Sequence, residues 1–226
     1  YLSFRVNGYV EKKRDRERDV HLSYRIDPLD FDGIPFDEPI TGEVKETILS
    51  DKDKDWSPKI RGEFFLPPLA LTGDFKVHIA VKDELSGKEV KTVVPSPVKG
   101  RPIKLTDTLS LQNCRFLRSE MDGQGLDPAA YRPGETVWAR FDMTGYKLGE
   151  ANKMHIGFGL EVRRADGSQL FAMPNAAEHS ESPNYPKRYI PNTFNLALEK
   201  YIAKGDYTLV MVARDLLGGQ TIEIER

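Results

Sequence analysis

Alternation of apolar and polar residues is the feature that most limits what this chain can fold into. Six runs place apolar side chains at every second position, with polar residues at many of the positions between them. Such alternation is typical of an antiparallel sheet that buries one face, and it does not fit the 3.6-residue repeat of a helix. The runs are Leu2–Val6, Val20–Ile26, Phe75–Val81, Val137–Met143, Ile156–Val162 and Tyr207–Ala213.

Turn signals separate these runs. Pairs that end in glycine, which is the residue that tight hairpins favour, occur at Asp32-Gly33, Ser86-Gly87, Asp166-Gly167 and Gly218-Gly219. Fifteen prolines spread over the chain argue against long helices. The mixed-charge stretch Glu11–Asp19 is expected to continue or connect strands as a solvated edge. We therefore expect an all-β protein.

The chain also repeats itself. The segment from Gly73-Asp74 to Asp83 matches the segment from Gly205-Asp206 to Asp215 at an offset of 132 residues. The run Val20–Ile26 is placed on Val137–Met143 at an offset of 117, and Leu2-Ser3-Phe4 falls on Leu109-Ser110-Leu111 at 107. Offsets that rise along the chain predict two copies of one unit, the second with longer loops. The largest of these insertions is expected around Pro174–Asn192.

The repeat predicts the domain organisation. We expect two tandem antiparallel β-sandwiches, residues 1–98 and residues 106–226, each with about seven short strands. Residues 99–105 are expected to join them, and Pro95, Pro97 and Pro102 would make this connection short and semi-stiff.

Two segments of the second copy carry a family resemblance. Tyr131-Arg-Pro133-Gly134-Glu135-Thr-Val137 before a strand, and later Gly205-Asp206-Tyr207-Thr-Leu209, resemble bacterial immunoglobulin-like domains. These include fibronectin-III-like and macroglobulin-like modules of secreted and surface proteins. The resemblance implies an immunoglobulin-like sandwich and an extracytoplasmic location, periplasmic, secreted or on the cell surface. It implies roles in adhesion, spacing or binding, and it carries no catalytic residues.

Composition excludes several classes of protein. The 33 basic and 35 acidic residues nearly cancel, so no electrostatic footprint for nucleic acid is present. No apolar run reaches the ~20 residues of a membrane-spanning helix, so we expect no membrane insertion. The single cysteine, Cys114, excludes an intramolecular disulfide and a cysteine-based zinc site. A start at Tyr1 without Met is expected for a mature or trimmed form.

The expected insertion at Pro174–Pro191 is the best candidate for binding. Tyr185, Arg188 and Tyr189 are residue types that anchor interfaces or stack on sugar rings. A second interpretation is that the segment is only a lid over the sandwich edge. His179, with Glu178 and Glu181, is a further candidate for ligand or metal binding, although a single histidine with two flexible acids is more often plain surface.

A second candidate is the acidic segment Asp51-Lys-Asp53-Lys-Asp55. Its alternating carboxylates resemble the start of a Ca²⁺-binding loop. Such a loop needs Gly at its sixth position and Glu at its twelfth, where this chain has Trp56 and Gly62. The sequence thus favours a solvated loop over a Ca²⁺ site, and no other cofactor is expected.

No catalytic motif occurs along the chain, so we expect a protein that is not an enzyme. The leading hypothesis is an exported adhesion, spacer or protein-binding module. The alternatives are a carbohydrate- or ligand-binding module that uses the aromatic residues of the second copy, and an accessory or inhibitory domain acting on an enzyme. The expected partner is a protein or a cell-surface glycan, and the oligomeric state stays open.

Overall fold

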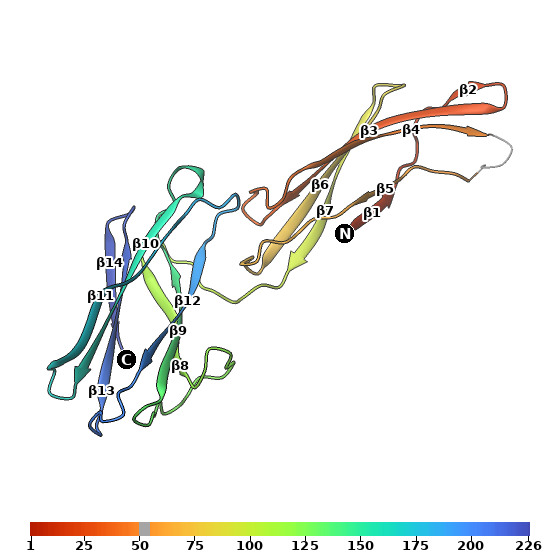
Figure 1. Cartoon of the computed structure of the whole chain (residues 1–226). Coiled ribbons are helices and arrows are strands. Elements are labelled where there is room, and N and C mark those ends of the chain that lie inside the picture. The colour runs from red at the N-terminus through yellow and green to blue at the C-terminus, as the bar shows by residue number, and fades with distance from the viewer. Residues whose placement is uncertain (50–54) are drawn as a thin grey trace. The chain divides into compact units, whose positions relative to one another are not determined.

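The computed structural model describes residues 1–49 and 55–226. The chain divides into two compact units, unit 1 (Tyr1–Pro102) and unit 2 (Ile103–Arg226), and the division falls inside residues 99–105. The strands of unit 1 run from red to yellow-green in Figure 1, and those of unit 2 from green to blue. The fold is all-β, as predicted: the described residues contain strands, turns and one short 3-10 turn, Glu150–Asn152.

Unit 1 contains seven strands in its described residues. They are β1 (Leu2–Arg5), β2 (Lys12–Arg14), β3 (Glu17–Leu29), β4 (Ile40–Leu49), β5 (Lys59–Gly62), β6 (Gly73–Asp83) and β7 (Glu89–Val98). β3 pairs with β4 and β6, β6 pairs with β7, and the short β2 pairs with the start of β3. β1 and β5 form a separate two-stranded sheet. Every pairing between these strands is antiparallel.

The two sheets of unit 1 pack face to face. Ile60 of β5 lies against Ile26 of β3 and Val77 and Ile79 of β6, and all four side chains are buried. A second, smaller cluster contains Val20, Leu22 and Ile48. Alternation explains the arrangement, because every second residue of β3 and β6 points toward the opposite sheet.

Unit 2 also contains seven strands, in two sheets. They are β8 (Ser110–Leu117), β9 (Thr136–Thr144), β10 (Met154–Arg164), β11 (Gln169–Glu181), β12 (Tyr189–Ala197), β13 (Tyr207–Asp215) and β14 (Gln220–Glu225). One sheet has the order β12-β9-β8 and the other has the order β11-β10-β13-β14. Both are antiparallel throughout. The two sheets enclose one cluster of buried residues, in which Phe141 of β9 meets Phe158 of β10 edge to face at 5.8 Å.

Strand pairing shows which elements of the two units correspond. The order β4-β3-β6-β7 in unit 1 has the same form as β11-β10-β13-β14 in unit 2. Leu22 of β3 pairs with Asp83, as Ile156 of β10 pairs with Asp215. The predicted match of Val20–Ile26 with Val137–Met143 is therefore wrong, because β3 corresponds to β10 and not to β9.

The counterpart of β9 is β1. Phe4 pairs with Ile60 of β5, as Phe141 pairs with Asn192 of β12. A common pattern follows in the sequence, Phe4-x-Val6-x-Gly8-Tyr9 in unit 1 and Phe141-x-Met143-x-Gly145-Tyr146 in unit 2. Both glycines have a positive φ, +77° at Gly8 and +74° at Gly145, a conformation that other residues rarely adopt. The predicted match of Leu2–Phe4 with Leu109–Leu111 is wrong for the same reason.

A buried aspartate occupies the same place in both units. The Asp83 carboxylate accepts hydrogen bonds from the backbone N–H of Leu85 in the β6–β7 turn and from that of Val10 near β2. The Asp215 carboxylate accepts the equivalent bonds from Leu217 and from Lys147. Each aspartate thus ties a hairpin to the segment that leads into the neighbouring strand. The turn glycines Gly87 and Gly219 close these hairpins with positive φ, as the sequence predicts.

Candidate functional site

The predicted insertion at Pro174–Asn192 is not a long loop. β11 continues to Glu181 and β12 begins at Tyr189, so only residues 182–188 connect the two strands. Pro174 lies within β11, at an irregularity where the pairing partner changes from Met173 opposite Leu160 to Ala177 opposite Phe158. A proline is tolerated there because β11 is an edge strand with a bulge.

The structure separates the aromatic candidates. Tyr189 is only 1% exposed and is the first residue of β12, opposite Thr144, whose side chain is also buried. Tyr185 is partly buried, and its hydroxyl accepts a hydrogen bond of 2.8 Å from Nη1 of Arg188. The Arg188 guanidinium lies 5.7 Å from the centre of the Tyr185 ring. Tyr189 is therefore no surface residue, and the other two contact each other.

The connection 182–188 is held in place by its neighbours. The Tyr146 hydroxyl donates a 2.6 Å hydrogen bond to the carbonyl of Lys187, and the Asn152 side chain donates to the carbonyls of Pro183 and Asn184. Lys187 Nζ forms an ion pair with Glu181. Burial raises the pKa of the Tyr146 hydroxyl. Because these contacts fix the connection to the rest of unit 2, it is not an open binding loop.

The residues around His179 divide between the two faces of β11. His179 Nε2 lies 3.1 Å from Glu181 Oε1, whereas Glu178, the adjacent residue, contacts His155 of β10 at 2.5 Å. Burial alone would raise the pKa of Glu181, but hydrogen bonds from Lys187 and His179 outweigh it and lower that pKa. Among the described residues, no three metal-ligating side chains converge. Glu178, His179 and Glu181 therefore do not form a common site.

The predicted Ca²⁺ segment is only partly covered by the structure. Asp51 and Asp53 lie outside the described residues, and Asp55 is exposed at the start of the segment that leads to β5. The Ca²⁺ hypothesis therefore stays a prediction.

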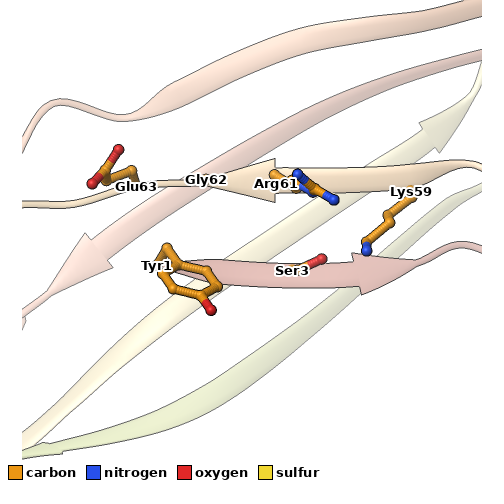
Figure 2. Close-up of a pocket in the computed structure, with 6 residues that line it drawn as sticks. All are labelled: Tyr1, Ser3, Lys59, Arg61, Gly62 and Glu63. Carbon is orange, nitrogen blue, oxygen red and sulfur yellow. The ribbon is translucent and has the colours of Figure 1, made fainter.

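A site that the sequence reasoning missed lies on the outer face of the β1–β5 sheet. A hollow of about 580 Å³ is lined by Tyr1, Ser3, Lys59, Arg61, Gly62 and Glu63. Figure 2 shows Lys59 reaching from β5 toward β1, with Arg61 beside it on the same face. Ser3 pairs with Arg61 across the sheet, and Arg5 pairs with Lys59.

This outer face is positively charged. Arg5 and Lys59 are directly opposite each other, an arrangement of like charges that destabilises a sheet. Arg5 Nη1 donates a 3.0 Å hydrogen bond to Ser57 Oγ. In the part of the chain that the structure describes, no carboxylate pairs with Arg5, Lys59 or Arg61. In the sequence, Ser3 and Arg5 flank an apolar residue, and so do Lys59 and Arg61. These two patterns indicate one charged face only once the two strands are known to pair.

Comparison with known proteins assigns no family to this chain. No family model matches the chain, and no curated protein matches it. One similar solved structure is the exo-β-D-glucosaminidase CsxA with inhibitors, at 11% identity and a TM-score of 0.28. Another is the exo-chitosanase CsxA of Amycolatopsis orientalis with PNP-β-D-glucosamine, at 12% identity and a TM-score of 0.28.

Both alignments cover 96% of this chain and 25% of the other. The chain thus spans about a quarter of the length of these enzymes. Their activity is not transferred to this chain. Within residues 1–49 and 55–226, no helix has the length and apolar character that a membrane span requires.

Proposed function

We propose that the chain is a non-catalytic tandem of immunoglobulin-like sandwiches that serves an exported protein as an adhesion, spacer or protein-binding module. The observation that carries the proposal is that the two units share a strand order and register, β4-β3-β6-β7 and β11-β10-β13-β14, which we call the repeated framework. The residues at matching positions in the two units hold the fold: the buried aspartates Asp83 and Asp215, and the left-handed glycines Gly8 and Gly145.

The strand order supports the immunoglobulin-like part of the proposal. In unit 2 the first, second and fifth strands form one sheet, and the third, fourth, sixth and seventh form the other. This division of seven strands belongs to the sandwich folds from which many cell-surface modules are built. A framework used twice, with edges and loops that differ, suits a support that presents surfaces to partners.

The geometry favours neither alternative. A carbohydrate site at the predicted residues would need exposed aromatic faces there, whereas Tyr189 is buried and Tyr185 lies against Arg188. An inhibitory segment would need a protruding loop, and residues 182–188 are held by Tyr146 and Asn152. We therefore propose neither role.

Two measurements test the proposal. Fractionation of cells that make the natural protein, with an antibody against this chain, is expected to place it outside the cytoplasmic membrane. The purified chain is expected to release no p-nitrophenol from p-nitrophenyl glycosides above the buffer rate. A cytoplasmic location, or saturable turnover that persists through repeated purification, would overturn the proposal.

A further inference from the structure

The edge strands of the two units are protected to different degrees. An edge strand presents unpaired N–H and C=O groups, which proteins usually block with charged residues, prolines or bulges. In unit 2, Pro174 and a bulge interrupt the edge strand β11. In unit 1 the edge strands β4 and β5 carry five charged residues, which are Glu43, Lys45, Glu46, Lys59 and Arg61.

The strand β12 lacks most of this protection. It pairs with β9 on one side, and among the described residues no strand pairs with its other side. None of its nine residues, Tyr189–Ala197, is charged. Pro191 has no N–H to offer a neighbour, so it protects the beginning of the strand. The unprotected part of the edge is therefore Thr193–Ala197.

The backbone of this part faces outward at alternate residues. Leu198 N–H donates a 2.9 Å hydrogen bond to the carbonyl of Glu135, which precedes β9. Because backbone groups alternate between the two sides of a strand, the N–H and C=O groups of Thr193, Asn195 and Ala197 point away from β9. These three residues can therefore form a ladder with a further strand.

Unit 1 closes the matching place with a side chain. Ala197 matches Phe65 at the offset of 132 residues, and Phe65 N–H donates a 2.8 Å hydrogen bond to the Asp37 carboxylate. Among the described residues, no side chain caps the N–H of Ala197. The edge that a carboxylate closes in unit 1 is thus open in unit 2.

The sequence of the open part is complementary to itself. Two copies that pair antiparallel about a two-fold axis at Asn195 place Thr193 of one copy opposite Ala197 of the other. Phe194 then faces Leu196 of the second copy, and both are half-buried apolar residues that pack against the core. The two Asn195 side chains meet at the axis, where each amide can both donate and accept. No charge meets a like charge along this pairing.

Pro191 selects this axis among those that the strand allows. An axis at Thr193 or Phe194 would bring Pro191 into the ladder, where it lacks an N–H. An axis at Leu196 or Ala197 would pair residue 199, which lies beyond the end of β12. The axis at Asn195 alone pairs all three outward N–H groups within the strand and without the proline.

We propose that the chain forms a symmetric homodimer in which the Thr193–Ala197 edges of two copies pair as antiparallel strands. The pairing joins two copies of the sheet β12-β9-β8 into one continuous sheet. This inference goes beyond the proposed function, because an adhesion, spacer or protein-binding module can act as a single chain.

The test measures self-association of the full chain by sedimentation equilibrium. We expect the wild type to dimerise reversibly. Asn195→Lys places two ammonium groups opposite each other at the axis, and Asn195→Glu places two carboxylates there. Each variant should therefore raise the dissociation constant about tenfold. An equimolar mixture of the two variants should dimerise at least as tightly as the wild type, because opposite charges then meet.

Thr221 provides matched controls, because it is exposed on β14, the strand at the other edge of unit 2's larger sheet. Thr221→Lys and Thr221→Glu carry the same charges and should leave the dissociation constant unchanged, alone or mixed. Should the variants at Asn195 fail to fold, amide NMR shifts of the wild type on dilution replace them. These shifts are expected to concentrate in β12.

A chain that stays monomeric up to about 1 mM would overturn the inference and would leave the β12 edge to a strand of a different protein. A dimer that is indifferent to charge at Asn195, that responds equally to charge at Thr221, or whose dilution shifts lie outside β12 would overturn it as well. None of these results bears on the proposed function, which is tested by cellular location and by the lack of turnover.

Discussion

Units 1 and 2 have the same framework but differ in their interiors. Unit 2 has one continuous cluster of fourteen buried apolar residues, whereas the interior of unit 1 is divided into clusters of four and three. The strand ladders and the buried aspartates do not account for the difference, because both units have them. One element in which they differ is β8: its Leu111 and Phe116 pack against the core of unit 2, and no described strand of unit 1 corresponds to it. We expect this covering strand to help join the apolar side chains beneath it into a single core.

The largest expected effect comes from truncating matched aromatic residues. Phe141→Ala should lower the free energy of unfolding of unit 2 by about 3–5 kcal/mol, because its ring is buried against Phe158 and Phe194. Phe4→Ala should cost unit 1 less than half as much, since Phe4 is only half-buried. Urea unfolding followed by NMR signals of each unit measures both. Equal losses would show that the covering strand does not control the core.

Next in size is the loss of the shared aspartate. Asp83→Asn and Asp215→Asn each replace an acceptor oxygen with an amide group that faces backbone donors. We expect both to destabilise their unit by about 1–3 kcal/mol, and by similar amounts. The same unfolding experiment applies. A large cost in one unit and none in the other would mean that the two aspartates are not equivalent.

Acid should weaken unit 1 through the same residue. Burial alone would raise the pKa of Asp83, but bonds from Ser86 and from the Val10 and Leu85 N–H groups outweigh it and lower that pKa. A lowered pKa in the folded state stabilises the fold above the unfolded value of about 3.9, and this contribution is lost as the pH falls toward the folded value. The stability difference between the wild type and Asp83→Asn should therefore shrink below about pH 4. A difference that stays constant from pH 6 to pH 2 would contradict this assignment.

The smallest effect is expected at a repeated surface pair. His21 contacts Glu43 at 3.1 Å, and the matching His155 contacts Glu178. Both pairs lie at the surface, with the glutamate side chains 63% and 67% exposed, so a double-mutant cycle with alanine should give a coupling below about 1 kcal/mol in each unit. Coupling well above that value in either unit would indicate a role beyond a surface ion pair.

Much of the fold could be predicted from the sequence because strands and tight turns leave local signals. Alternation located the strands, and the glycine pairs located their turns, as at Gly87 and Gly219. The predicted match of the Phe75 and Tyr207 strands at an offset of 132 is confirmed, because β6 pairs with β3 in unit 1 in the same register as β13 pairs with β10 in unit 2. Alternation is common to all buried strands, however, so it could not distinguish a counterpart of β9 from one of β10. The pattern that ends in Gly8-Tyr9 and Gly145-Tyr146 could have done so.

The candidate sites were harder to predict. Pro174 and the prolines after it indicated a loop, but an edge strand accommodates a proline where a bulge interrupts its pairing. Tyr189 resembled a surface anchor because nothing local showed that it is buried at the start of a strand. The cationic face of β1 and β5 depends on pairing between segments far apart in sequence, such as Arg5 with Lys59, and no local pattern reports such a pairing.

The constant offset of 132 residues from β5 through β7 to their counterparts has a practical consequence. Ile60 opposite Phe4, Val77 opposite Val94 and Asp83 opposite Leu22 match Asn192, Leu209 and Asp215 without insertion or deletion. The closing three strands of one unit therefore match those of the other in spacing along the chain and in register, although the strands differ in length. A chimera that joins the first half of unit 1 to the last three strands of unit 2 would therefore keep these strand pairings in the same register.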